Sequence, residues 1–232
     1  MHGITFSATS PAVVGQNFGT YAALAGINSS GAGGTGVLAQ TDGNSSAPGN
    51  ALISEIVGAG AGNTALFIAN GANVARIDQN GKGFFNGGTQ TGGADIAEYF
   101  DVEGSSSNYE PGDVLIISQQ TDRTVEKSAT PYSNLVVGVY ATKPGVLLTE
   151  KNAEQNNLQG GVPMGVIGVI PTKVCLEGGA IKRGDMIVSS SLRGVAMKAD
   201  IDKVKPGQVI GKALQDYNGN GVGKINILVS IK

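Results

Sequence analysis

The first 94 residues place the strongest limit on what this chain can fold into, because they hold so few bulky side chains. This segment contains 20 of the 37 glycines of the 232-residue chain and only five charged residues. Short apolar runs begin at positions 12, 22, 36, 51, 65, 74 and 83, and turns rich in Gly, Asn and Ser separate them. Such spacing predicts a loose repeat of short strands joined by turns.

Each of these runs supplies only one to three large apolar side chains. A glycine-rich strand also gains little from packing, so one copy of the segment would bury too little apolar surface to be stable. Three copies around one axis would place each Val, Leu or Phe against its mates. We therefore expect residues 1–94 to form a homotrimeric β-prism or triple β-helix stalk. A flexible linker and a single-chain solenoid are the alternatives.

A hairpin is expected at the end of the glycine-rich segment. Two apolar runs, Val74–Ile77 and Gly83–Phe85, flank an Asn-Gly pair at positions 80 and 81, which predicts strand, turn and strand. The pattern Ile-Asp-x-Asn-Gly-x-Gly-x-Phe at positions 77–85 resembles an ending found just ahead of the terminal domain in phage tail fibres and bacterial fibre-like surface proteins. The resemblance implies an extracellular location, on a virion or a cell-surface appendage.

Residues 95–232 have the composition of an ordinary soluble domain, with 14 of the 16 basic and 15 of the 18 acidic residues. Runs rich in β-branched residues recur at short spacing and are separated by Pro and Gly, so the whole chain is expected to be all-β, with a compact β-barrel or sandwich at its end. The predicted strands are Val114–Ser118, Thr124–Lys127, Leu135–Ala141, Val146–Thr149, Val162–Ile170, Thr172–Leu176, Met186–Ser189, Val195–Lys198, Val209–Leu214 and Gly223–Ile231.

The C-terminal domain also contains an internal repeat. Glu110–Ser118 resembles Lys182–Ser190, since in each a Gly-Asp turn leads into an apolar run. Gly112 and Gly184 are 72 positions apart, and the later Gly138 and Gly211 are 73 apart. We expect two pseudo-repeats, at about 110–140 and 182–213, that form one β core.

The junction at Asp95 and Glu98 has two interpretations. A capping box would place these two acids, three positions apart, at the start of a one-turn helix.

Alternatively, the segment 94–100 resembles the small-Asp-x-Ala-Glu-aromatic opening of the self-cleaving C-terminal domain of phage neck appendages. That resemblance implies an intramolecular chaperone that drives trimerisation and then cleaves at Ala94–Asp95, with Asp95 and Glu98 as catalytic carboxylates. Ala94 stands where that family has a hydroxyl residue. A related bacterial group carries Gly-Ala-Asp-x-Ala-Glu ahead of a Pro-Gly-Asp domain, which resembles residues 92–232.

Other sites have little support in the sequence. The single His, the single Cys at position 175 and the absence of a phosphate-binding loop predict no further catalytic set, no cofactor and no metal site. Asp216–Gly221 matches half of an EF-hand loop, but Ile227 replaces the final Glu, which favours a hairpin turn over a weak Ca²⁺ site. Arg183–Asp185 is an Arg-Gly-Asp tripeptide expected in a turn. The sequence has no basic stripe, so nucleic-acid binding is not expected. It also has no apolar run of ~18 residues, so membrane insertion is not expected.

A polar segment, Leu148–Gly161, is expected to be an exposed loop, and such loops often carry binding residues. Its candidate contacts with a cell-surface receptor or glycan are Thr149, Glu150, Lys151, Asn152 and Glu154. A solvated insertion without a binding role is the alternative. Together these features predict a structural and attachment protein, the distal part of a trimeric fibre on a phage, an injection particle or a cell surface.

Overall fold

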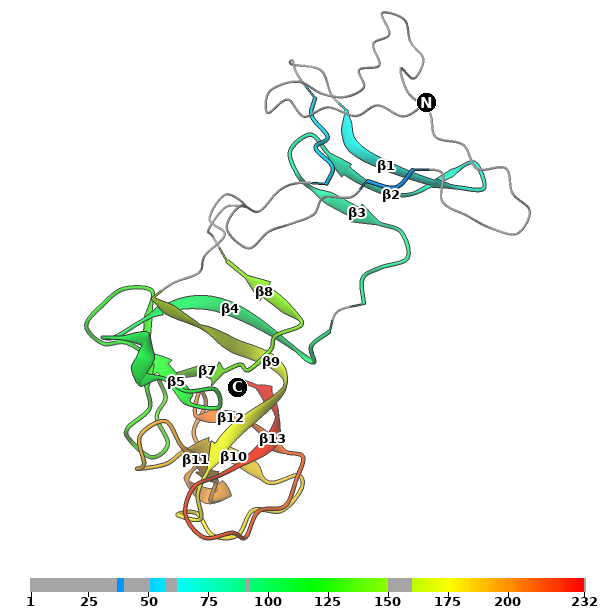
Figure 1. Ribbon diagram of the computed structural model, residues 1–232. Coiled ribbons are helices and arrows are strands. Elements are labelled where there is room, and N and C mark those ends of the chain that lie inside the picture. The colour runs from blue at the N-terminus through cyan, green and yellow to red at the C-terminus, as the bar shows by residue number, and fades with distance from the viewer. Residues whose placement is uncertain (1–36, 40–50, 57–61, 91, 150–159, 232) are drawn as a thin grey trace, which may run out of the picture. The chain divides into compact units, whose positions relative to one another are not determined.

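The structure is a computed structural model that describes residues 37–39, 51–56, 62–90, 92–149 and 160–231. Its contacts divide the chain into two units, Met1–Gly88 and Thr89–Lys232. Apart from two short 3-10 helices, every regular element in the described residues is a β-strand (Figure 1). The all-β class predicted from the sequence is therefore confirmed.

Unit 1 contains an antiparallel sheet of three strands in the order β1-β2-β3. The strands are β1 (Asn63–Ala69), β2 (Ala72–Asp78) and β3 (Gly83–Phe85). The Asp78 carboxylate accepts hydrogen bonds from the N–H groups of Asn80 and Lys82, at 2.9 and 3.0 Å, and Gly81 has a φ of +79°. The predicted hairpin with its Asn-Gly turn is thus confirmed. Most of the predicted stalk before β1 lies outside the described residues.

Unit 1 has no buried core of its own among the described residues. Not one of them is buried, and the side chains of Phe67 and Phe85 are 51% and 50% exposed. Phe67 and Phe85 flank Ala75 in one row across the three strands, so they share a face. In the neighbouring row, the guanidinium of Arg76 lies 3.4 Å from the centroid of the Phe84 ring.

Unit 2 is built on one mixed sheet of ten strands, in the order β11-β10-β12-β13-β9-β7-β5-β6-β4-β8. Its elements are β4 (Asp95–Val102), η1 (Ser106–Asn108), β5 (Val114–Ile117), β6 (Thr124–Lys127), β7 (Val136–Tyr140), β8 (Val146–Leu148), β9 (Gly161–Val174), β10 (Met186–Ser189), β11 (Ala196–Lys198), η2 (Ile201–Lys203), β12 (Val209–Ala213) and β13 (Gly223–Ser230). Further pairings join β9 to β4 and to β11, so the ladders close into two rings of five strands that share β9.

Strand β9 was predicted as two strands separated by Pro171, and that prediction is wrong. The structure has one strand of 14 residues, which runs alongside β13 (Figure 1). Its pairing with β13 includes Pro171 itself, opposite Asn226. Proline lacks an N–H, so it fits a strand only where no donor is needed. β4 pairs with β9 only as far as Gly168, and β11 pairs with it only at Val174. One edge of β9 is therefore free of a ladder partner at Pro171.

The predicted capping box at Asp95 is also wrong. Asp95 begins β4, which pairs with β9 in antiparallel fashion and with β6 and β8 in parallel fashion. Local hydrogen bonding by Asp and Glu favours a helix start, but pairing along three other strands satisfies the backbone of β4 on both edges. Non-local pairing therefore overrides the local signal.

Two groups of strands in unit 2 have matching ladders. Val114 pairs with Val139 in the first group, and Met186 pairs with Lys212 in the second, at offsets of 72 and 73. Each ladder has an irregularity one residue further, after Leu115 and after Ile187. The Gly-Asp turns also match, because the Asp113 and Asp185 carboxylates each accept the N–H three residues earlier, at 2.8 Å.

The buried interior of unit 2 consists of three apolar clusters. The largest joins side chains of β5 and β7 to those of β9, β10, β12 and β13, and includes Ile170, Ile187, Ile210 and Ile227, all fully buried. A second cluster surrounds Leu115, and a third surrounds Cys175, whose thiol is buried and free. Both repeats thus contribute to one shared interior.

Candidate functional site

The Ala94–Asp95 peptide bond lies where the chain enters β4, beside the middle of β9. The Ala94 carbonyl oxygen accepts a hydrogen bond from the Val169 N–H at 3.2 Å, and the Asp95 carbonyl accepts one from Gly145 at 2.8 Å. Gly168 has a φ of +121°, and a Cβ there would lie 2.5 Å from the Ala94 oxygen. The backbone therefore holds this peptide bond firmly against β9, and only glycine fits at position 168.

The Asp95 side chain is buried at this point. Asp95 is 8% exposed, and its Oδ2 atom has no hydrogen-bond partner among the described residues. A Cβ at Gly165 would lie 3.4 Å from that oxygen, which places the carboxyl against β9. Burial raises the pKa of Asp95 above its ordinary value, because a buried carboxylate loses its hydration. Burial thus makes the charged carboxylate less favourable here than at an exposed aspartate.

A cavity of about 410 Å³ adjoins the same peptide bond, and Gly93, Ala94, Asp95 and Gly168 all line it. Ile96, Val146 and Ile167 form its apolar wall. The cavity leaves space for a water molecule beside the Ala94 carbonyl.

Glu98, the second predicted carboxylate, does not share a face with Asp95. Both residues lie on β4, where successive side chains point to opposite faces of the sheet. Glu98 pairs with Met164 of β9 and Leu148 of β8, while Asp95 pairs with Gly168. One chain by itself thus does not bring the two carboxylates together.

The predicted binding loop begins directly after β8. Thr149, its first candidate residue, is exposed. The remaining candidates, Glu150, Lys151, Asn152 and Glu154, lie outside the described residues.

Two motifs singled out in the sequence are used for structure. Arg183–Asp185 lies in the turn before β10, as predicted, and Lys198 Nζ lies 3.0 Å from the Asp185 carboxylate. Burial raises the pKa of Asp185, but the Lys182 N–H and Lys198 outweigh it and leave that pKa below its ordinary value. Asp216 accepts the Arg183 N–H at 2.9 Å, so one of its oxygens is already engaged. No group of three or more potential metal ligands occurs in the described part of the chain.

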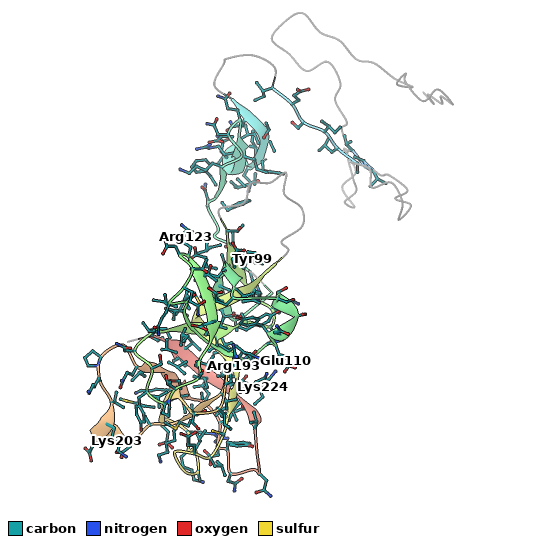
Figure 2. The ribbon with its side chains drawn as sticks, turned by 90° about the vertical axis from the view of Figure 1, so that its left-hand side faces the viewer. Tyr99, Glu110, Arg123, Arg193, Lys203 and Lys224 are labelled. Atoms are coloured by element: carbon teal, nitrogen blue, oxygen red, sulfur yellow. The ribbon has the colours of Figure 1, made fainter. Side chains whose placement is uncertain are left out.

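A buried charge cluster that the sequence analysis missed surrounds Asp113. Asp113 is 1% exposed, and its carboxylate lies 2.7 Å from Lys173 Nζ and 3.6 Å from Lys127 Nζ. Burial lowers the pKa of Lys173, but its hydrogen bonds to Asp113 and Glu110 outweigh burial and raise that pKa above its usual value. Glu110 and Lys224 lie close together at the rim of this cluster, where Lys224 donates to the Pro111 carbonyl (Figure 2). The cluster ties the Gly-Asp turn to β6 and β9.

An apolar groove of about 740 Å³ lies over β10, β12 and β13. Met186, Val209 and Leu228 line it from the strands, and Ile201 and Val204 line it from the segment around η2. Lys205 and Lys212 also lie along the groove. The part of the chain that the structure describes contains no helix long and apolar enough to cross a membrane.

Comparison with known proteins gives few similarities. No protein-family model matches the chain, and no curated protein matches it. Among solved structures, the pre-mature bacteriophage phi29 gene product 12 superposes with a TM-score of 0.47 and 16% identity, over 69% of this chain and 24% of that one. A C-terminal fragment of the same gene product gives a TM-score of 0.40 and 17% identity, over 59% of this chain and 100% of the fragment. The chain thus spans about a quarter of the length of the first of these proteins.

Proposed function

We propose that this chain is a structural and attachment protein, the distal part of a homotrimeric fibre on a phage, an injection particle or a cell surface. The observation that carries the proposal is the exposure of unit 1. Its three-stranded sheet has no buried residue in the described part, yet it carries Phe67 and Phe85 on one face. A sheet with an apolar face must bury that face against another element to form a stable core. Identical copies would supply the missing cover.

The oligomeric state of the full chain tests this proposal. Sedimentation or mass photometry at micromolar concentration should report three chains. Phe67→Asp should weaken the assembly, because it places a charge among apolar side chains. Gln79→Asp, in the exposed turn after β2, is the matched control and should leave the assembly unchanged. A monodisperse wild-type monomer would overturn the proposal.

In the proposed attachment role, unit 2 is the part of the chain that contacts the receptor. The polar loop that starts at Thr149 is the proposed contact with a surface receptor or glycan. A glycan array and whole-cell adsorption should show binding by the full chain, and deletion of residues 150–159 should remove it. Binding that persists after the deletion would reject this loop as the contact.

A second proposed function is self-cleavage at Ala94–Asp95, which the geometry of that bond favours. Water would add to the Ala94 carbonyl carbon, the Val169 N–H would stabilise the developing oxyanion, and the carbon–nitrogen bond would break. The protonated Asp95 carboxyl would give its proton to the leaving amine, its own backbone nitrogen, since a raised pKa suits a general acid. A second copy would contribute Glu98 as the base that takes the proton from water.

A denaturing gel of the purified full chain separates the two functions. Cleavage would yield two fragments that meet at Ala94–Asp95, and Asp95→Asn or Glu98→Gln would prevent it. A fragment whose N-terminal sequence begins at Asp95 identifies the bond. An intact 23.4 kDa chain after prolonged incubation would reject self-cleavage and leave the structural role in place.

A further inference from the structure

The two repeats of unit 2 differ in what covers one face of their strands. In the first repeat, Val114 and its partner Val139 are fully buried in the large cluster, together with second-repeat residues such as Ile210. At the equivalent ladder position of the second repeat, Met186 is partly buried and its partner Lys212 is exposed. The face that the first repeat covers with strands of the same domain is therefore open in the second repeat.

This open face forms the apolar groove over β10, β12 and β13. Leu228, which pairs with Lys212, is 45% exposed within it, and Ile201 at its edge is 63% exposed. Contiguous exposed apolar surface on a soluble domain marks a contact site more often than scattered residues do.

The exposed apolar surface continues beyond the groove across the sheet. On β13, Ser230 follows Leu228 on the same face and pairs with Ile167 of β9. Ile167 pairs with Ile96 of β4, which in turn pairs with Val146 of β8. Directly paired residues project from the same face of a sheet. We call Val146, Ile96, Ile167 and Leu228 the apolar stripe; its most exposed member is Ile167, at 51%.

The two ends of the apolar stripe carry opposite charges. Lys212 lies beside Leu228 at one end, and Glu98 follows Ile96 on the same face of β4 at the other. Neither side chain forms an ion pair with another described residue. Two copies that meet head to tail would therefore bring unlike charges together. Head-to-tail contacts between identical chains form a closed ring, such as a trimer, when the rotation from one copy to the next closes, and an open filament when it does not.

We propose that the apolar stripe is the surface on which unit 2 of one chain packs head to tail against unit 2 of the next copy. This inference rests on the proposed homotrimer and names the surface that unit 2 contributes to it. A second copy fits the stripe better than a small ligand does, because the exposed side chains extend across four strands, well beyond the groove. The first repeat also shows that strands of this same domain cover such a face.

Thiol labelling of variants of the full chain that each add one cysteine to Cys175 tests the proposal locally. Leu228→Cys places a thiol on the stripe, and Ile117→Cys places one at a site of similar exposure, 45% against 49%, on β5 and away from the stripe. Cys175 is buried, so the wild-type chain gives the background rate. In the trimer, the thiol at position 228 should react at least about tenfold more slowly than the thiol at position 117.

The outcomes separate this inference from the proposed function. A wild-type monomer would reject the homotrimer itself and the stripe with it. A trimer in which both thiols react at equal rates would keep the homotrimer and overturn the stripe as its interface. Protection of position 228 in a chain that sediments as a monomer would assign the groove to a bound small molecule and also overturn the proposal.

A charge exchange tests the head-to-tail orientation. Lys212→Glu and Glu98→Lys should each raise the protein concentration at which the trimer dissociates, because each variant places like charges together. The double variant should recover much of the loss, since it restores an unlike pair with the signs reversed. A double variant that is weaker than both single variants would overturn the head-to-tail orientation.

Discussion

Replacement of Asp113 by Asn offers a direct test of how unit 2 is held together. The Asp113 carboxylate is 1% exposed and faces Lys173 at 2.7 Å and Lys127 at 3.6 Å. Asn removes the negative charge and leaves both ammonium groups, whose side chains are only 18% and 20% exposed, without it. Loss of one partner from a buried ion pair costs about 3 to 5 kcal/mol. Because Glu110 still binds Lys173, we expect the lower end, about 3 kcal/mol.

The internal repeat supplies the matched control, Asp185→Asn. Asp185 makes the same turn hydrogen bond, but its side chain is 22% exposed and its single ammonium partner, Lys198, is 35% exposed. An ion pair of this exposure contributes about 1 kcal/mol or less.

Urea denaturation of the full chain at one fixed protein concentration measures both variants. With an m-value of about 2 kcal/mol/M, the midpoint should fall by about 1.5 M for Asp113→Asn and by at most about 0.5 M for Asp185→Asn. Equal shifts for the two variants would refute the reasoning that burial decides the difference.

Three further predictions concern single positions. Burial raises the pKa of Asp95, so its ionisation opposes folding once the pH rises above about 3.9. Asp95→Asn should therefore stabilise unit 2 more at pH 7 than at pH 3, and urea titrations showing the reverse order would contradict this. Gly168→Ala should cost about 2 kcal/mol or more, because its Cβ would lie 2.5 Å from the Ala94 oxygen, whereas Gly179→Ala, at a φ of +89° in open space, should cost less in thermal melts. Val139→Lys should abolish stable folding, as judged by near-ultraviolet circular dichroism, because it buries an unpaired charge where the second repeat exposes Lys212. A folded variant would contradict the burial of position 139 in the shared interior.

The strands of unit 2 were largely predictable from the sequence because their signals are local. Runs rich in β-branched residues marked β5, β6 and β10 to within one residue. The offset between Gly112 and Gly184 also anticipated matching ladders, because a Gly-Asp turn fixes where the following strand begins. The same offset could have pointed to Asp113 as a structural carboxylate, although nothing in the sequence indicated that Lys173 would reach it.

The tertiary structure decided the features that depend on distant parts of the chain. β4 was missed, because three strands far away in sequence complete its backbone hydrogen bonds and its own residues suggested a helix start. Pro171 did not break β9, since the edge that would need its N–H has no ladder partner there.

The sequence by itself determined the all-β class, the turn positions and the contrast between a glycine-rich, charge-poor beginning and an ordinary domain, because composition and spacing act residue by residue. Only the tertiary structure decided that Asp95 is buried beside the Ala94 carbonyl, that Glu98 points to the opposite face, and that the second repeat leaves an apolar face open. These features depend on strand register and on which face meets which, and neither is encoded in any one stretch of the chain.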